Sequence, residues 1–296
     1  MAVHIVFEEF YSQVGPHLKF RDTPLLSWPR LAHRRLYYRL IRALERLVYG
    51  DSPANRLAAV SGLVAAQLQR HFRRADVNVI RNGVDANFFC PSTRLSRRGE
   101  ARERFGLSDN EFTLLFIGND WKNKGLSAVL GALVDCRKSP LKLLVVGDDD
   151  RRSYSETIQR FAIEDRVCFL PKSADVLQFY AAADTCVAPS LEDAFGLPVL
   201  EAMACGLPVI SSPRAGVSEI INDRMDGFVL RNPEDSHELA ELLRMLCSNS
   251  ELCRQIGERA RATAVRNGWE DNVDQLWDLL EATAEQKNKS VNAHST

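Results

Sequence analysis

The sequence has no long apolar run and no paired-cysteine spacing. No apolar stretch among its 296 residues approaches the about 20 that a membrane-spanning helix needs. The seven cysteines are odd in number and include no Cys-x-x-Cys pair, which argues against a disulfide framework and against a zinc site. Early glutamates and no basic segment at the N-terminus are not typical of a signal peptide. Together these absences predict a cytoplasmic protein with reduced thiols.

Net charge is also nearly absent, but the charge is unevenly distributed. Residues 1–75 hold 12 Lys/Arg against 5 Asp/Glu, a balance of +7, whereas the whole chain carries −1. Arginines alternate with leucines over residues 27–49, which predicts a basic amphipathic helix. Its arginines are Arg30, Arg34, Arg35, Arg39, Arg42 and Arg46. The helix is either a solvated outer helix with its apolar face on a core, or a surface for anionic lipid at the membrane periphery. Nucleic acid is less favoured, because no stacking aromatics accompany the arginines.

The length allows about two domains, and the second half has a regular α/β pattern. Short apolar runs predict strands at Thr113–Ile117, Leu141–Val146, Val167–Leu170, Cys186–Ala188, Val209–Ser211 and Phe228–Leu230. Helices are predicted between them, at Leu126–Cys136, Tyr154–Phe161, Val176–Ala183, Val199–Cys205 and Ser218–Ile221. Strands that are apolar throughout and joined by helices predict a parallel sheet covered on both faces.

The two ends of the chain are less regular. The first part predicts a strand at Val3–Phe7, an irregular stretch to Ser27, the basic helix, strands at Leu57–Ser61 and Val77–Ile80, and a helix at Leu63–Phe72. Asn232 before Pro233 predicts a helix start, and the final helices are placed at Glu234–Cys247, Glu251–Arg266 and Glu270–Gln286. The polar residues 287–296 are expected to be disordered.

The stretch Asp193–Glu201 carries the clearest chemistry. A strand and loop precede it, and a short helix with a proline in its first turn follows, closed by Gly206. A helix N-terminus attracts anions, because its first N–H groups lack partners. We expect Glu201 in the first turn, where its carboxylate could accept hydrogen bonds from sugar hydroxyls. The alternative is that Glu201 only complements the helix dipole and Asp193 is a loop acid.

The residues from Pro189 to Ile210 resemble the retaining glycosyltransferases of family 4, whose signature is two glutamates separated by seven residues around a Phe-Gly turn. Glu201 matches the second glutamate, and Asp193 replaces the first with a side chain one methylene shorter. The resemblance implies the GT-B fold of two Rossmann-like domains. It also implies that Glu201 holds the ribose of a nucleotide-sugar donor and Asp193 its sugar. The donor-binding residues of this loop are Ala194, Phe195, Gly196, Leu197 and Glu201.

A second motif spans residues 116–125, between a strand and a helix, where Rossmann folds bind phosphate. Lys124 followed by Gly125 matches the family pattern, whereas Asn119 replaces the usual arginine after Gly118. We predict Gly118, Asn119 and Lys122 as donor-binding residues and Lys124 as catalytic. The alternative is that Lys122 and Lys124 are solvated. The variant resembles the lipopolysaccharide-core branch of the family.

The resemblance implies transfer of a hexose from a nucleotide diphosphate sugar, most simply UDP-linked, to a glycan or glycolipid hydroxyl with retention of configuration. Asp193, Lys124 and Glu201 are the predicted catalytic residues. No metal or other cofactor is expected, because cationic groups and a helix N-terminus replace it. The acidic run Asp148–Asp150 is predicted to be a solvated loop, with metal binding as its alternative. His4, Glu8 and Glu9 are acceptor-side candidates that are more simply structural.

The predicted domains are 1–91 on the acceptor side, 92–268 for the donor, and a helix at 269–286 that returns toward the first domain. The first domain lacks the opening strand and glycine-rich loop of the family. The chain is therefore expected to bind donor better than it transfers sugar. Two other functions stay open, a partner-dependent nucleotide-sugar-binding subunit and a nucleotide-sugar 2-epimerase.

Overall fold

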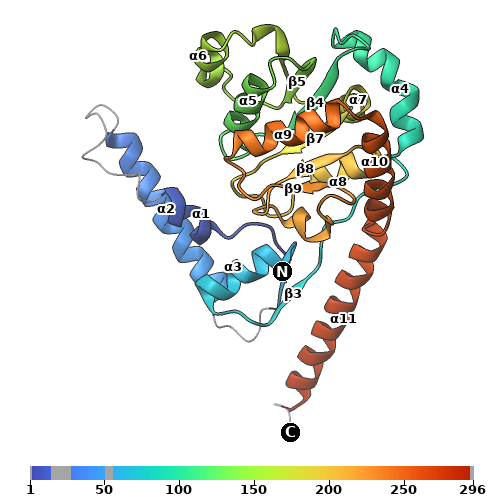
Figure 1. Cartoon of the computed structure of the whole chain (residues 1–296). Helices are drawn as coiled ribbons and strands as arrows, with labels where there is room; N and C mark the ends of the chain where they lie inside the picture. Colours follow the sequence, from blue (N-terminus) through green and yellow to red (C-terminus); the bar gives the residue numbers. More distant parts are fainter. Residues whose placement is uncertain (1, 15–27, 51–55, 294–296) are drawn as a thin grey trace. The chain divides into compact units, whose positions relative to one another are not determined.

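The computed structural model describes residues 2–14, 28–50 and 56–293. The chain forms two compact units, one of residues 1–81 with 275–296 and the other of residues 82–274. Each contains a parallel sheet with helices between its strands (Figure 1). The predicted α/β class with two Rossmann-like sheets is therefore confirmed, with six strands in the second unit and three in the first among the described residues.

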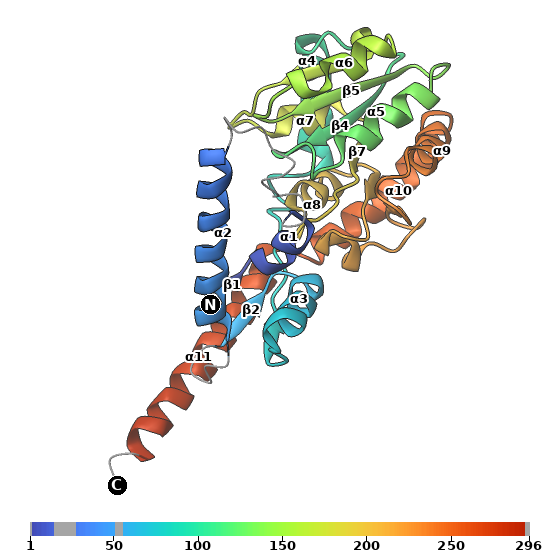
Figure 2. The same ribbon diagram turned by 90° about the vertical axis from the view of Figure 1, so that its left-hand side faces the viewer.

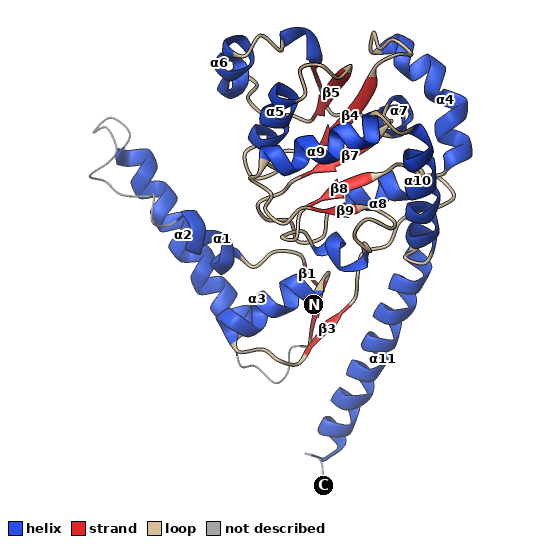
Figure 3. Ribbon diagram, in the orientation of Figure 1, coloured by secondary structure: helices blue, strands red, loops and turns tan. Residues whose placement is uncertain are grey.

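The larger sheet belongs to the second unit and is parallel throughout. Its strands are β4 (Phe112–Ile117), β5 (Leu141–Val146), β6 (Val167–Leu170), β7 (Thr185–Ala188), β8 (Val209–Ser211) and β9 (Phe228–Val229). Their order is β6-β5-β4-β7-β8-β9, the Rossmann order in which the chain reverses direction after three strands. Each strand begins and ends within one residue of its predicted position. Most residues of these strands are apolar, and helices cover both faces of the sheet (Figure 3).

The main core fills the space between this sheet and two of its helices. Leu114 and Leu143, which are register partners in β4 and β5, pack there with Val129 and Leu133 of α5 (Leu126–Asp135). Leu239 joins them from α9 (Ser236–Cys247). The helices α4 (Pro91–Arg104), α6 (Arg152–Arg160), α7 (Leu177–Ala182), α8 (Leu197–Ala204) and α10 (Ser250–Val265) complete the unit. The segment predicted as a helix at Ser218–Ile221 is a 3-10 helix, η5 (Gly216–Ile220).

Two predictions about the C-terminal helices are wrong in detail. Helix α9 begins at Ser236 rather than after Asn232, because the Asp235 side chain accepts hydrogen bonds from the N–H groups of His237 and Glu238. The final helix, α11 (Trp269–Ala293), continues through most of the segment expected to be disordered. Residues 294–296 of that segment lie outside the described residues.

The smaller sheet belongs to the first unit and has short strands. β1 (Ala2–Val3), β2 (Leu57–Ala59) and β3 (Val77–Val79) pair in that order and in parallel. Helix α3 (Gly62–Phe72) follows β2, and Figure 2 shows it beside this sheet. Its first turn is capped by Ser61, whose hydroxyl accepts a hydrogen bond from the Val64 N–H at 3.2 Å.

A helix occupies part of the stretch predicted to be irregular. Residues Phe7–Val14 form α1, so the predicted strand at Val3–Phe7 ends at Val3, and residues 15–27 lie outside the described part. The start of α1 is capped from a distance, since the Glu45 carboxylate accepts hydrogen bonds from the N–H groups of Phe7 at 2.5 Å and Glu8 at 2.8 Å. A cap supplied 38 residues away leaves no local sequence signal.

Glu45 belongs to the predicted basic helix, which is α2 (Trp28–Tyr49). One narrow stripe of α2, formed by Leu31, Tyr38 and Glu45, is buried, and the rings of Phe7, Phe10 and Tyr11 pack against Leu31 and Tyr38. A second apolar stripe, Leu36, Leu40, Leu44 and Leu47, is exposed, with 68% of Leu36 and 76% of Leu47 accessible. The helix is therefore amphipathic, but only part of its apolar surface is packed on a core.

Candidate functional site

The site lies at the carboxyl edge of the six-stranded sheet, where the strand order reverses between β4 and β7. In open α/β sheets, ligands bind at this switch point. The loops that follow β4 and β7 contain the two sequence motifs. Lys124 comes from the first loop and Asp193 from the second, and the distance between Lys124 Nζ and Asp193 Oδ2 is 2.5 Å. The structure thus brings together two predicted residues that are 69 positions apart in the sequence.

Close packing of the two loops produces this contact. Gly125 lies so near the β7 loop that a Cβ atom would come within 2.1 Å of the Pro189 carbonyl oxygen, and its φ is +83°. Only glycine fits that position. Asn123 connects the same loops, because its side-chain amide donates to the Glu192 carbonyl at 2.8 Å and its own carbonyl accepts from the Leu191 N–H at 2.7 Å. Sequence reasoning did not find this role of Asn123.

Helix α8 begins directly after the Phe-Gly turn. Gly196 is its N-cap residue with φ +98°, a backbone conformation that favours glycine. The N–H groups of Gly196 and Leu197 have no acceptor among the described residues. The Phe195 N–H instead donates to Asp193 Oδ1 at 3.3 Å, and the Phe195 side chain is buried. Unpaired N–H groups at a helix start carry partial positive charge, so this end of α8 favours an anion.

Glu201 occupies a different part of α8 from the one predicted. The helix begins at Leu197, so Glu201 lies in its second turn rather than its first. Its Oε2 accepts a hydrogen bond of 2.5 Å from the hydroxyl of Tyr180, which is completely buried. Burial raises the pKa of Glu201, and the hydrogen bond from Tyr180 acts in the opposite direction. Tyr180 therefore holds the carboxylate in place, a role that no sequence pattern indicated.

The loop after β4 is anchored by Trp121. Its side chain is only 2% exposed, its Nε1–H donates to the Gly118 carbonyl at 2.9 Å, and its backbone N–H donates to Asp149 Oδ2 at 2.8 Å. Asn119 uses its side-chain oxygen to accept from the Asp148 N–H at 2.9 Å. Asn119 thus joins the loops after β4 and β5, whereas Lys122 is exposed and has no side-chain partner among the described residues.

The three carboxylates of Asp148–Asp150 turn to separate partners. Asp148 pairs with Lys172 at 2.8 Å and Asp150 with Arg152 at 2.8 Å, and each of these hydrogen bonds lowers the pKa of its aspartate. Asp149 binds the loop backbone at Trp121. Within the described residues, no group of three or more His, Cys, Asp or Glu side chains is arranged to hold a metal ion.

The acceptor-side candidates lie in the first unit, after β1. Glu8 forms an ion pair with Arg42 at 2.6 Å, which lowers the pKa of Glu8. Glu9 pairs with His71 at 2.7 Å and with Arg70 at 3.1 Å. His4 is exposed. These partners give both glutamates a structural role in joining the helices of this unit.

The fold is a parallel α/β fold with Rossmann strand order, and comparison with known proteins gives its family. Residues 97–263 match the family model described as glycosyl transferases group 1, and the chain belongs to that family. It is 27% identical to the lipopolysaccharide glucosyltransferase WaaG of Escherichia coli K12 over 253 residues, which is 84% of this chain and 66% of that protein.

Two solved structures show the same arrangement. A crystal structure of WaaG, described as a glycosyltransferase involved in lipopolysaccharide biosynthesis, aligns with a TM-score of 0.73 and 26% identity over 88% of this chain and 68% of that one. The Anabaena protein HepE, solved in complex with UDP and glucose, aligns with a TM-score of 0.69 and 28% identity over 76% of this chain and 62% of that one. The chain spans about half to two thirds of the length of the curated relatives it matches. No helix in the described part of the chain has the length and hydropathy to span a membrane.

Proposed function

We propose that this chain binds a nucleotide diphosphate sugar, most simply a UDP-hexose. We propose that it transfers the hexose to a hydroxyl of a glycan or glycolipid with retention of configuration. The observation that carries the proposal is the contact between Lys124 and Asp193 at the switch point, beside the start of α8. The group 1 family and the UDP complexes of HepE support the nucleotide-sugar donor.

In this proposal the diphosphate lies at the start of α8. The N–H groups of Gly196 and Leu197 donate to its oxygens, and Lys124 supplies a full positive charge. The sugar lies toward Asp193, whose carboxylate accepts hydrogen bonds from its hydroxyls. The ribose lies toward Glu201, which Tyr180 holds in position. Gly118, Asn119 and Lys122 line the phosphate side as lesser contacts.

Transfer in such a site is driven by stabilisation of the departing diphosphate. Negative charge grows on the phosphate oxygens as the bond to the anomeric carbon breaks, and preorganised donors stabilise that charge more than they stabilise the ground state. In this proposal the Asp193 carboxylate binds Lys124 and the sugar hydroxyls and is not given the role of a nucleophile. The proposal therefore has the acceptor hydroxyl attack from the face that the phosphate leaves, with its proton passing to a phosphate oxygen, which retains the configuration.

The same charges predict that transfer needs no metal. Lys124 and the start of α8 supply the positive charge that a divalent ion would otherwise provide. We expect EDTA to leave donor binding and any transfer unchanged. A loss that Mg²⁺ or Mn²⁺ restores would contradict this and would make Asp148–Asp150 the residues to mutate first.

In this proposal the first unit contacts the membrane and binds the acceptor. The exposed leucines of α2 and the arginines beside them suit an anionic lipid surface, where a glycolipid acceptor would be found. Arg42 is not available for this, since Glu8 holds it and its guanidinium lies 4.2 Å from the centre of the Tyr11 ring. Arg34 donates to the Tyr38 hydroxyl at 2.7 Å. Arg30 and Arg39 are exposed and would face lipid, whereas Arg46 is exposed but also pairs with Glu8 at 3.4 Å.

Calorimetric titration with UDP, UMP and uridine tests the donor site. Each phosphate adds charge-assisted hydrogen bonds worth about 1.5–3 kcal/mol, so we expect affinity to rise by about tenfold or more from uridine to UMP and again to UDP. ADP and GDP serve as controls for the base. If uridine binds as tightly as UDP, the start of α8 and Lys124 are not the phosphate site and the proposal fails.

A further inference from the structure

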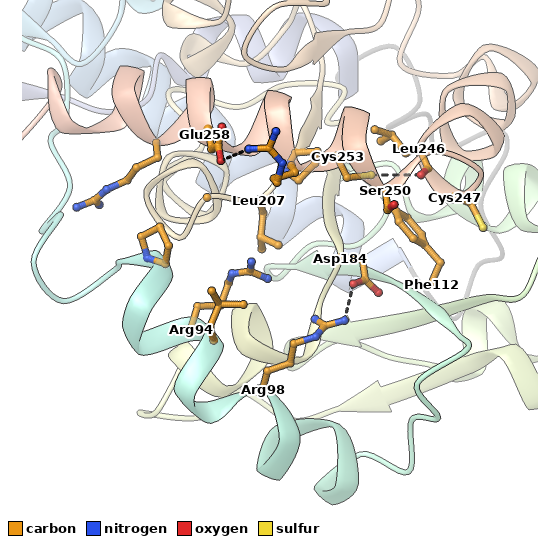
Figure 4. A pocket seen from close by; sticks show the side chains of 17 residues that line it. Arg94, Arg98, Phe112, Asp184, Leu207, Leu246, Cys247, Ser250, Cys253 and Glu258 are labelled. Carbon is orange, nitrogen blue, oxygen red and sulfur yellow. Dashed lines mark hydrogen bonds and ion pairs between the residues drawn. The ribbon is translucent and has the colours of Figure 1, made fainter.

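The second unit contains a cavity at the opposite edge of its sheet from the donor site. It has a volume of about 550 Å³ and lies where β4, β7 and β8 begin, lined there by Phe112, Asp184 and Pro208. Its other walls come from α4 and α10 (Figure 4). Small-molecule sites commonly enclose about 300–1,000 Å³, so this cavity has the size of a ligand site that the proposed donor chemistry does not use.

The walls of the cavity are largely apolar. Leu207 and Leu246 are fully buried beneath it, and Leu95 lies at its rim with 57% of its side chain exposed. Four arginines and two acids add charge to this apolar surface: Arg94, Arg98, Arg254, Arg261, Asp184 and Glu258. An apolar enclosure with a few polar groups is typical of a site for a molecule that is itself partly apolar.

Three of the four arginines already have partners. Arg98 pairs with Asp184 at 2.6 Å, and Arg254 pairs with Glu258 at 2.5 Å. Arg261 donates to three backbone carbonyls, those of Ala86, Phe89 and Ala204, at 2.8–3.0 Å. Arg98 and Arg261 therefore join separate parts of the wall, whereas Arg254 pairs within α10.

Arg94 differs from the other three. It has no carboxylate partner among the described residues, and its one hydrogen bond, to the Ala183 carbonyl, is long at 3.4 Å. Its Nε is buried and has no acceptor. Burial lowers the pKa of Arg94, and the neighbouring Arg98 adds to that effect. Asp184, the carboxylate near Arg94, is already paired with Arg98 and Arg102. A buried donor without an acceptor and a buried cation without a carboxylate of its own both cost free energy, and an anion in the cavity would offset both costs.

We propose that this cavity is a binding site for a small amphipathic carboxylate, whose anionic group binds the Arg94 guanidinium and whose apolar body lies against Leu95 and Phe112. A planar carboxylate matches the paired N–H groups of a guanidinium. Figure 4 shows Arg94 directed from α4 toward Leu207, within the space between α4 and α10. The site is separate from the donor site and does not depend on the function proposed for it.

Octanoate is a suitable probe, with octanol as its uncharged counterpart, and binding to the full chain can be measured by calorimetry. We expect octanoate to bind saturably and octanol to bind at least tenfold more weakly. Arg94→Met should weaken octanoate binding at least tenfold, whereas Arg94→Lys should keep more of it. Arg254→Met is the matched control, because Arg254 lies on the same cavity but has its own carboxylates. It should change the affinity less than threefold.

A second variant covers the case in which Arg94→Met does not fold. Leu95→Glu places a carboxylate at the exposed rim, where it should repel octanoate without disturbing the core, and Leu95→Gln controls for lost apolar area. We expect the glutamate to weaken octanoate binding several-fold more than the glutamine does. Equal binding of octanoate and octanol, or octanoate binding that neither Arg94→Met nor Leu95→Glu changes, would overturn the proposal.

Discussion

The two units differ in how completely their sheets and helices cover one another. In the second unit, strands of up to six residues are buried on both faces. The cavity lies at one end of this sheet, and the loops with Lys124 and Asp193 lie at the other. In the first unit, the strands have two or three residues, and α2 leaves an apolar stripe exposed. The second unit therefore holds the loops of the proposed donor site on a packed sheet, whereas the described part of the first unit leaves part of α2 exposed, for which we propose contact with lipid.

The two units also differ in what their charged side chains bind. The second unit's Lys124 and Asp193 meet at a switch point, where they pair with each other and Asp193 also accepts from the Phe195 N–H. The first unit's acids, Glu8, Glu9 and Glu45, are each engaged in holding helices together. The proposed donor site is therefore preorganised, whereas the glutamates of the first unit have structural partners. Four predictions test this difference, beginning with the largest effect.

The first prediction compares donor binding with sugar transfer. We expect the 296-residue chain to bind UDP saturably but to form glycoside from UDP-glucose at or below the rate without enzyme. Transfer requires an acceptor positioned against the donor, and such positioning can lower a barrier by about 7–11 kcal/mol. Radiolabelled transfer to lipid and sugar acceptors measures it. A turnover of about 1–10³ s⁻¹, ordinary for enzymes, would show that the first unit positions an acceptor well.

The second prediction concerns Lys124. Lys124→Ala should remove a charge-assisted hydrogen bond and weaken UDP binding by about 1.5–3 kcal/mol, or about ten- to a hundredfold, and Lys124→Arg should recover part of it. Uridine binding should not change, because uridine carries no phosphate. Lys138→Ala, an exposed lysine before β5, is the matched control. Equal weakening of UDP and uridine would mean that the substitution disturbs the loop rather than the phosphate site.

The sheet could be predicted because the residues of each strand form a short, mainly apolar run in the local sequence. Val167–Leu170 is a continuous apolar run, and Leu141–Val146 is apolar except for Lys142; the observed bounds of both strands equal the predicted ones. The family motif placed Lys124 and Asp193 in the loops that the strand order then brings together. What was missed depends on contacts between distant residues. The Glu45 carboxylate that starts α1 and the Tyr180 hydroxyl that holds Glu201 leave no trace in the local sequence.

The start of α9 shows a different reason for error. Asn232 and Pro233 form a good helix-start pattern, but Asp235, three residues later, forms the better one because its carboxylate accepts from two N–H groups. Residue propensity alone does not decide which of two N-cap candidates three residues apart starts the helix. The same limit applies to α8, which starts two residues before the predicted Val199 and so has Glu201 in its second turn.

The third prediction concerns Glu201. Glu201→Ala should weaken UDP binding by about 1.5–3 kcal/mol, and Glu201→Gln should weaken it less, because the amide still offers an oxygen to the ribose. Tyr180→Phe should have a smaller effect, about threefold, since it removes only the group that positions the carboxylate. Comparing UDP with 2′,3′-dideoxy-UDP locates the contact, because a ligand without ribose hydroxyls should not distinguish Glu201→Ala from the unchanged chain. If it does, Glu201 acts on the fold and not on the ribose.

The fourth prediction has the smallest effect per residue and belongs to the first unit. Each exposed arginine of α2 should contribute at most about 1 kcal/mol to binding of anionic lipid, so Arg39→Gln should reduce co-sedimentation with phosphatidylserine vesicles only slightly, and salt should weaken it further. Leu40→Gln and Leu47→Gln should reduce it more, because they remove apolar area.

Arg42→Gln is the informative contrast. Arg42 is held by Glu8 and by the ring of Tyr11, so its loss should lower the melting temperature while leaving vesicle binding near that of the unchanged chain. If the Arg39, Arg42, Leu40 and Leu47 variants all bind vesicles equally well, or if the unchanged chain does not bind vesicles at low salt, the exposed stripe of α2 does not face lipid.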